Sequence, residues 1–155
     1  MATIRVFQVG DELELSNLIK CVYDEFVAPD YSKAGNDFFY DFIVADCFVD
    51  RINTKDNIIL VAECDNLKIG MIEVRDNNHI SLLFVDKHYH GQGIARELFV
   101  QAVKMCKMRD KDLDKFYVHA SPYSVPIYQK LGFHKTNEIQ EQFGIKYIPM
   151  EMMIA

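Results

Sequence analysis

The chain has 155 residues, of which 50% are apolar, and a formal net charge of −6. A chain of this length can bury about 70% of its unfolded surface, so we expect one domain spanning residues 1–155. The acidic charge argues against nucleic acid as a partner, because phosphate binding needs a basic surface. No apolar run approaches the roughly 20 residues of a membrane-spanning helix, and Met1–Arg5 leads directly into a strand-like segment. We therefore expect no membrane partner and no signal peptide.

The four cysteines show no spacing typical of metal ligands. Cys21 and Cys106 fall on the apolar stripes of predicted helices, so we expect buried, reduced thiols. Reduced thiols and the lack of a leader predict a cytoplasmic location.

Apolar residues recur with helical or strand periodicity along the chain, and turn residues separate the segments. We find no internal repeat, linker or low-complexity segment. In chain order, the expected elements are a strand at Ile4–Val9, a helix beginning after Asp11 and ending before Pro29, a helix at about Asn36–Ile52, paired strands at Ile58–Cys64 and Lys68–Arg75, a strand at His79–Val85, a helix from Ile94, a strand at Lys115–Ala120, a short helix ending at Gly132, and a hairpin of Thr136–Glu141 with Ile145–Ile154.

A glycine-rich turn joins the strand His79–Val85 to the helix that begins at Ile94. Gly91 and Gly93 can adopt backbone angles closed to other residues, and they leave neighbouring N–H groups uncovered. Such a turn at a helix N-terminus presents unpaired donors at the positive end of the helix dipole, which suits a phosphate. A helix start with flexible glycines and no ligand would give the same pattern.

Two phosphate-binding motifs are excluded at this turn. No Gly-Lys-Ser/Thr follows it, as a P-loop requires, and Arg96 stands where the dinucleotide fingerprint needs a third small residue. The pattern that fits is Arg/Gln-x-x-Gly-x-Gly/Ala, present here over residues 90–95 as HGQGIA.

A second motif follows at residues 121–133, SPYSVPIYQKLGF. Ser121 or Ser124 can cap a short helix, and Gly132 suits the left-handed position at its C-terminal end. The two motifs, with one strand between them, resemble those of the GNAT-type N-acetyltransferases, which bind acetyl-coenzyme A. The resemblance extends over the whole chain, with a small bacterial acetyltransferase of unassigned substrate as the nearest type.

The resemblance implies a single GNAT domain with an α+β fold, in which about four helices flank a central mixed, mostly antiparallel sheet of six to seven strands. It also implies acetyl-coenzyme A as the co-substrate and no metal. His90 departs from the family's usual Arg or Gln, and its ring is mostly neutral at pH 7, so we expect weaker or more pH-dependent coenzyme binding. The residues expected to contact the coenzyme are Leu83, Phe84, Val85, His90, Gly91, Gln92, Gly93, Ile94, Ala95 and Ser124.

The resemblance also implies two catalytic roles. The N–H of Leu83 is the expected donor to the thioester carbonyl, although an ordinary core strand would have the same sequence. Tyr128 occupies the position of the family's general-acid tyrosine, which protonates the departing thiolate. The alternative for Tyr128 is an aromatic side chain that only packs on the sheet.

The general base is open among three residues. Side-chain alternation places His79 on the same strand face as Ser81 and Leu83, and an imidazole near pKa 6.5 is suited to relaying a proton through water. Glu73 on the preceding strand is the competitor, and His119 is a third candidate. A solvated residue at a strand end is the plain alternative for His79.

The resemblance assigns the acceptor side to the helices after the first strand. The segment Asp24–Arg51 contains seven acidic side chains against Lys33 and Arg51, and it would attract a cationic amine if it formed a rim. Two solvated helix faces would explain the same charges.

We therefore expect an enzyme that transfers an acetyl group from acetyl-coenzyme A to a primary amine by direct attack. The expected partner is a small cationic molecule, with a protein N-terminus or lysine as the alternative and a homodimer as a possible assembly. The alternative to an enzyme is a non-catalytic protein that binds acyl-coenzyme A as a sensor. Such a protein would need neither Tyr128 nor a general base.

Overall fold

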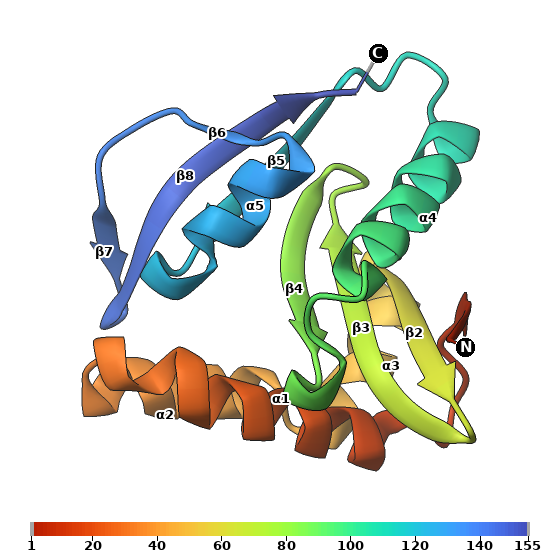
Figure 1. Ribbon diagram of the computed structural model, residues 1–155, viewed down its shortest axis with the longest axis horizontal. Helices are drawn as coiled ribbons and strands as arrows, with labels where there is room; N and C mark the ends of the chain where they lie inside the picture. The colour runs from red at the N-terminus through yellow and green to blue at the C-terminus, as the bar shows by residue number, and fades with distance from the viewer. Residues whose placement is uncertain (1, 155) are drawn as a thin grey trace.

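The computed structural model describes residues 2–154, which form one mixed sheet with helices on both faces (Figure 1). No helix in this range is long and apolar enough to cross a bilayer. The elements are β1 (Thr3–Val6), α1 (Glu12–Phe26), the 3-10 turn η1 (Ala28–Asp30), α2 (Lys33–Phe42), α3 (Ala45–Lys55), β2 (Ile58–Cys64), β3 (Leu67–Arg75), β4 (His79–Val85), η2 (Lys87–Tyr89), α4 (Ile94–Arg109), β5 (Lys115–Ala120), η3 (Pro122–Ser124), α5 (Val125–Leu131), β6 (His134–Lys135), β7 (Gln140–Gln142) and β8 (Ile145–Met153).

The sheet has the strand order β1-β2-β3-β4-β5-β8-β6, with β7 paired to β8. Every pairing is antiparallel except that of β4 with β5. The expected α+β fold is confirmed. Residues 2–154 contain eight strands and five α-helices, slightly more than the six to seven strands and about four helices expected.

The core lies in two layers, one on each face of the sheet. Leu98, Phe99 and Ala102 of α4 pack with the α5 side chains on one face. On the other face, Leu15 of α1 and Phe48 of α3 are fully buried against β2, β3 and β4. Apolar burial of this kind is the main stabilising term of a domain, and it fixes β4 between the two layers.

The single helix expected over Asn36–Ile52 is wrong, because the chain breaks between α2 and α3. Val44 adopts extended angles (φ −56°, ψ 136°). The side chains of Ser16 and Arg51 donate to the carbonyls of Ile43 and Phe42 at 2.7 and 2.8 Å. These bonds satisfy carbonyls that a continuous helix would have paired within itself. Tertiary contacts therefore override an apolar pattern that runs through the break.

The cysteines of residues 2–154 form no disulfide with one another. Cys106 is buried as expected, but Cys21 is exposed. The prediction for Cys21 is wrong because the buried stripe of α1 runs through Leu18, Ile19 and Val22 and passes beside position 21.

Candidate active site

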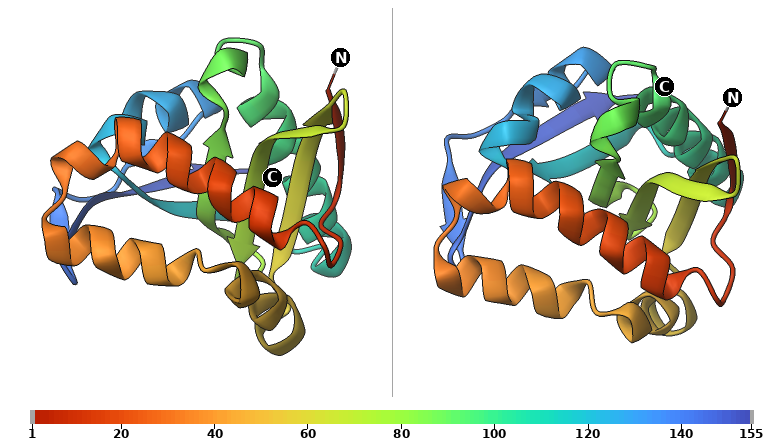
Figure 2. Two further views of the ribbon diagram at one scale, coloured as in Figure 1. Left: turned by 90° about the horizontal axis from the view of Figure 1, so that it is seen from below. Right: turned by 60° about the horizontal axis from the view of Figure 1, so that its bottom comes forward.

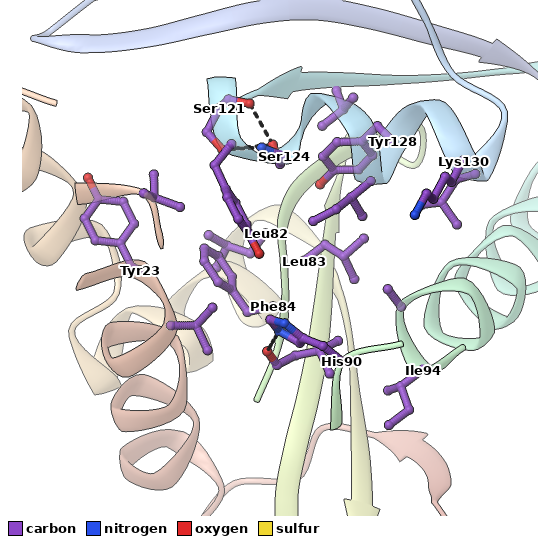
Figure 3. A pocket seen from close by; sticks show the side chains of 18 of the residues that line it. Tyr23, Leu82, Leu83, Phe84, His90, Ile94, Ser121, Ser124, Tyr128 and Lys130 are labelled. Carbon is purple, nitrogen blue, oxygen red and sulfur yellow. Dashed lines mark hydrogen bonds between the residues drawn. The ribbon is translucent and has the colours of Figure 1, made fainter. Parts of the chain in front are cut away.

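A cavity opens where β4 and β5 separate. The two parallel strands pair only at His79–Tyr117 and Ile80–Val118, and beyond these pairs the strands diverge. The resulting cavity has a volume of about 490 Å³, within the usual range for small-molecule sites. Figure 3 shows its lining, with β4 and the side chains of α5 facing the N-terminus of α4.

The edge of β4 that faces the cavity has backbone groups available for a ligand. Asp86 donates its N–H to the carbonyl of Ile69 on β3 at 2.7 Å. Because alternate residues of an antiparallel strand bond to the same neighbour, Leu82 and Phe84 turn their N–H and C=O groups toward β3. The corresponding groups of Leu83 and Val85 therefore point into the space between β4 and β5.

His90 supports this orientation. Its Nε2 lies 2.7 Å from the carbonyl oxygen of Val85, and because a carbonyl only accepts, Nε2 donates. The imidazole ring thus spans from the glycine turn to the open edge of β4 (Figure 3). In this arrangement Nε2 is already used and is not directed at a phosphate.

The glycine turn has the geometry expected of an anion cradle. Gly91 and Gly93 adopt left-handed φ values of 78° and 81°, and a Cβ at either would meet no atom within 4 Å. No side chain caps the N-terminus of α4, so its first N–H groups and positive dipole end face open space. Arg96 and Lys130 line the same cavity and add positive charge.

All the predicted coenzyme residues except Gln92 line this cavity. Gln92 instead lines a neighbouring hollow beside β1 and α4. Ser124 lines the cavity and donates its Oγ to the carbonyl of Ser121 at 3.0 Å.

Tyr128 is buried and lines the cavity from α5. Its ring packs edge-on against Phe133, with ring centres 5.5 Å apart. Figure 3 shows its hydroxyl directed into the cavity near Leu83. Burial raises the pKa of the Tyr128 phenol, so the hydroxyl keeps its proton at neutral pH.

A β-bulge corrects the expected alternation along β4. Glu73 pairs with Leu82 and Val74 pairs with Ile80, so Ser81 is an extra residue with no partner on β3. Leu83 consequently packs on the same face as Ile80 and not on that of His79. The Ser81 Oγ is buried, lines the cavity and has no hydrogen-bond partner among residues 2–154.

Of the histidine candidates for the base, His119 lines the cavity and His79 does not. The His79 ring lies edge-on to His119 with ring centres 4.7 Å apart, and His119 stacks on Tyr147 at 4.3 Å. Burial, with the charges of Arg75 and His119, lowers the pKa of His79 to about 3. Burial and Arg75 also lower the pKa of His119. The geometry therefore replaces His79 with His119 as the candidate base.

Glu73 lies outside the cavity and is fully buried. Its carboxylate accepts from Arg51 at 2.6 and 3.0 Å and from Asn57 at 2.8 Å. A carboxylate held by a buried guanidinium is a structural ion pair. The alternative assignment of Glu73 as the base is not supported by its position.

The acidic segment 24–51 contributes no carboxylate to the cavity lining. Asp24, Glu25 and Asp37 form ion pairs with lysines at 2.8, 2.9 and 2.7 Å. Residues 2–154 also contain no group of three or more His, Cys, Asp or Glu side chains placed to hold a metal ion.

Aromatic side chains of the helices α1 and α2 form a part of the site that the sequence did not indicate. Tyr23, Tyr31 and Phe39 line the cavity, and Figure 3 shows Tyr23 across it from the start of α4. The apolar stripe of α1 predicted Tyr23 as core, and periodicity does not distinguish a core position from a cavity wall.

The fold is shared with solved acetyltransferase structures. A GCN5-related N-acetyltransferase from Rhodopseudomonas palustris has a TM-score of 0.84 at 17% identity, covering 99% of this chain and 96% of that one. The PaiA N-acetyltransferase from Thermoplasma acidophilum, in complex with coenzyme A, has a TM-score of 0.79 at 19% identity, with 99% of each chain covered.

Sequence similarity reaches a curated relative as well. The chain is 25% identical over 117 residues to a spermidine N(1)-acetyltransferase from Escherichia coli K12, a match covering 66% of this chain. The match spans only 59% of the length of that relative.

The sequence profile of the family described as "Acetyltransferase (GNAT) domain" matches residues 27–154, which is more than half of the chain. The cavity at the split between β4 and β5, with the uncapped start of α4 beside it, is compatible with the coenzyme that this family uses. The chain therefore belongs to the GNAT family of acetyltransferases, enzymes that take their acetyl group from acetyl-coenzyme A.

Proposed function

We propose that this enzyme transfers the acetyl group of acetyl-coenzyme A directly to a small primary amine within the cavity between β4 and β5. One observation carries the proposal. The buried hydroxyl of Tyr128 and the open backbone edge at Leu83 face the same cavity, at the uncapped start of α4. A donor for the carbonyl, a donor for the leaving thiolate and a site for phosphates are thus close together.

The coenzyme pyrophosphate binds the N–H groups of residues 91–95 and the positive end of the α4 dipole. The pantetheine arm lies along the open edge of β4, beside Leu83 and Val85. The Leu83 N–H donates to the thioester carbonyl and stabilises the negative charge that develops on its oxygen during attack.

The amine nitrogen forms a bond to the carbonyl carbon, the carbon–sulfur bond breaks, and the proton that the nitrogen then loses converts the departing thiolate to the thiol. Tyr128 supports this step because its retained proton can form a hydrogen bond to the departing thiolate. The parent thiol titrates near pKa 8.5, below the phenol of Tyr128, so the hydroxyl stabilises the thiolate mainly through a hydrogen bond.

A primary amine is mostly protonated at pH 7 and must lose a proton before attack. His119 accepts this proton, directly or through one water. Its position on the cavity lining supports the assignment, and burial, which lowers its pKa, keeps the imidazole neutral at pH 7 with a lone pair that can accept a proton. Ser81, whose buried Oγ has no partner among residues 2–154, supplies a contact for the amine or for that water.

The acceptor is a small cation. Two observations support this class: the net charge of −6, which attracts cations over the surface, and the similarity to an enzyme named for spermidine. Among residues 2–154, the cavity lining contains no carboxylate. We therefore expect an acceptor with one ammonium group, the group that reacts.

The test is a product analysis with acetyl-coenzyme A and a set of primary amines. We expect release of coenzyme A thiol only when an amine is present, with one N-acetylated amine formed per thiol. If the folded protein binds coenzyme A but acetylates no amine, peptide α-amino group or lysine, a non-catalytic acyl-coenzyme A sensor would be the better interpretation.

A further inference from the structure

The side of the cavity formed by α1 and α2 has an aromatic wall, of which Figure 3 labels Tyr23. Val22, Tyr23 and Val27 of the α1 region line it and are buried. Phe39 of α2 stacks on Tyr23 with ring centres 3.8 Å apart and ring planes at 3°. Tyr31 adds a third ring, 6.1 Å from that of Tyr23. Tyr23 is fully buried by these contacts, so the half-buried rings of Phe39 and Tyr31 form the surface that suits a flat apolar group.

Among the described residues, the polar groups of this wall offer no negative charge to a second ammonium group. The Tyr23 hydroxyl donates its proton to Asn36 Oδ1 at 2.8 Å and can offer an ammonium group only a neutral oxygen. Within residues 2–154, the cavity lining contains no Asp or Glu, and its permanently charged side chains, Arg96 and Lys130, are both cations. A polyamine would bury charge here without a counter-ion, which is costly.

The hairpin of β7 and β8 lies beside this wall and contributes Ile145 to the cavity lining. Its turn packs against the start of α2, as Figure 2 shows, and a Cβ placed on Gly35 would lie only 2.6 Å from the carbonyl carbon of Gly144. A polypeptide cannot pass between two backbones in contact, so the contact between the hairpin and α2 favours a small acceptor.

We infer that the acceptor is a primary monoamine whose amino group is attached by a short chain to an aromatic ring; this inference rests on the proposed function. The ring lies against Phe39 and Tyr31, and the amino group points toward the thioester near Leu83. The one ammonium group is the nucleophile itself and loses its charge before attack, so no carboxylate is needed to hold it.

The first experiment compares kcat/KM for 2-phenylethylamine, 1,4-diaminobutane and spermidine at saturating acetyl-coenzyme A. Burial of one phenyl group predicts a preference of about 50-fold for the aromatic amine. If either polyamine equals the aromatic amine, the inference is overturned and amine acetylation stands. If no amine releases thiol from protein that binds coenzyme A, the proposed function fails and the inference fails with it.

The second experiment changes the wall. Phe39→Glu adds a carboxylate beside Tyr23 and should reduce the preference for 2-phenylethylamine over 1,4-diaminobutane at least tenfold. Ala34→Glu, at an exposed position of the same helix, adds the same charge and should leave the preference unchanged. Phe39→Leu keeps an apolar side chain and should lower the preference about fivefold, which covers the case in which Phe39→Glu does not fold. An unchanged preference in folded Phe39→Leu would overturn the inference.

Discussion

Gly35 and Gly144 lie backbone against backbone, although they are far apart in the sequence. A Cβ on Gly144 would lie 2.7 Å from the Gly35 nitrogen, and one on Gly35 would overlap the Gly144 carbonyl. The Ser32 Oγ also donates to the Gly144 carbonyl at 3.4 Å. The contact holds the β7–β8 hairpin on α2, beside the part of the cavity where we propose that the acceptor binds.

Replacing Gly35 by alanine tests this contact. Alanine is the better helix former by about 1 kcal/mol, but the added methyl meets backbone atoms that cannot move aside cheaply, at a cost of about 1–3 kcal/mol. We expect a lower free energy of unfolding, by roughly 1–2 kcal/mol, and a raised KM for the amine. Ala34→Ser, one position earlier and exposed, should change the free energy of unfolding by less than about 0.5 kcal/mol. If the KM for the amine is unaltered in Gly35→Ala, the position of the hairpin has no effect on binding of the acceptor.

Tyr128→Phe removes only the hydroxyl and keeps the ring that packs on Phe133. If Tyr128 serves the departing thiolate, turnover should fall by about 10²-fold or more, while coenzyme A affinity changes little. Steady-state kinetics and calorimetry with coenzyme A measure the two quantities separately. Turnover per folded molecule equal to that of the parent would restrict Tyr128 to packing.

Gly93 allows a comparison that isolates charge at the glycine turn. Asparagine and aspartate have the same shape, and both tolerate a left-handed φ better than other side chains, here 81°. Gly93→Asp places a negative charge where the phosphates approach the start of α4, whereas Gly93→Asn does not. Calorimetry should show coenzyme A binding at least tenfold weaker in the Asp variant than in the Asn variant. Equal affinities would place the phosphates elsewhere.

Local sequence patterns predicted the parts of the fold that local physics determines. The strand His79–Val85 and the helix start at Ile94 match the expectation residue for residue, because an apolar strand, a glycine turn and an amphipathic helix each leave their own periodicity. The short helix carrying Tyr128 is likewise marked by its own capping residues.

Features set by contacts between distant residues were missed. The bulge at Ser81 depends on how β4 pairs with β3, and one extra residue reverses the faces of all residues beyond it. The break at Val44 depends on side chains of α1 and α3, and the burial of Glu73 depends on Arg51. None of these partners is recognisable from sequence spacing.

His79 makes stability depend on pH. Burial and nearby positive charge lower its pKa in the folded protein to about 3, whereas the unfolded imidazole titrates near 6.5. Between about pH 6.5 and 3 the unfolded state binds the extra proton, so the free energy of unfolding falls as the pH falls.

The measurement is urea unfolding at pH 7.5 and pH 5. His79→Asn should reduce the difference in free energy of unfolding between the two pH values by about 1 kcal/mol, after allowance for solvent screening. His134→Asn, at an exposed position, should leave that difference unchanged. The same difference in His79→Asn as in the parent would show that the imidazole is not desolvated.

Binding of acetyl-coenzyme A along the open edge of β4 is tested most directly by amide hydrogen exchange, resolved residue by residue. We predict that saturating acetyl-coenzyme A slows exchange at Leu83 and Val85 at least tenfold, because their N–H groups gain a partner. Exchange at Leu82 and Phe84, whose N–H groups already face β3, should change far less. Unchanged exchange at Leu83 and Val85 in the saturated complex would contradict binding of acetyl-coenzyme A along this edge of β4.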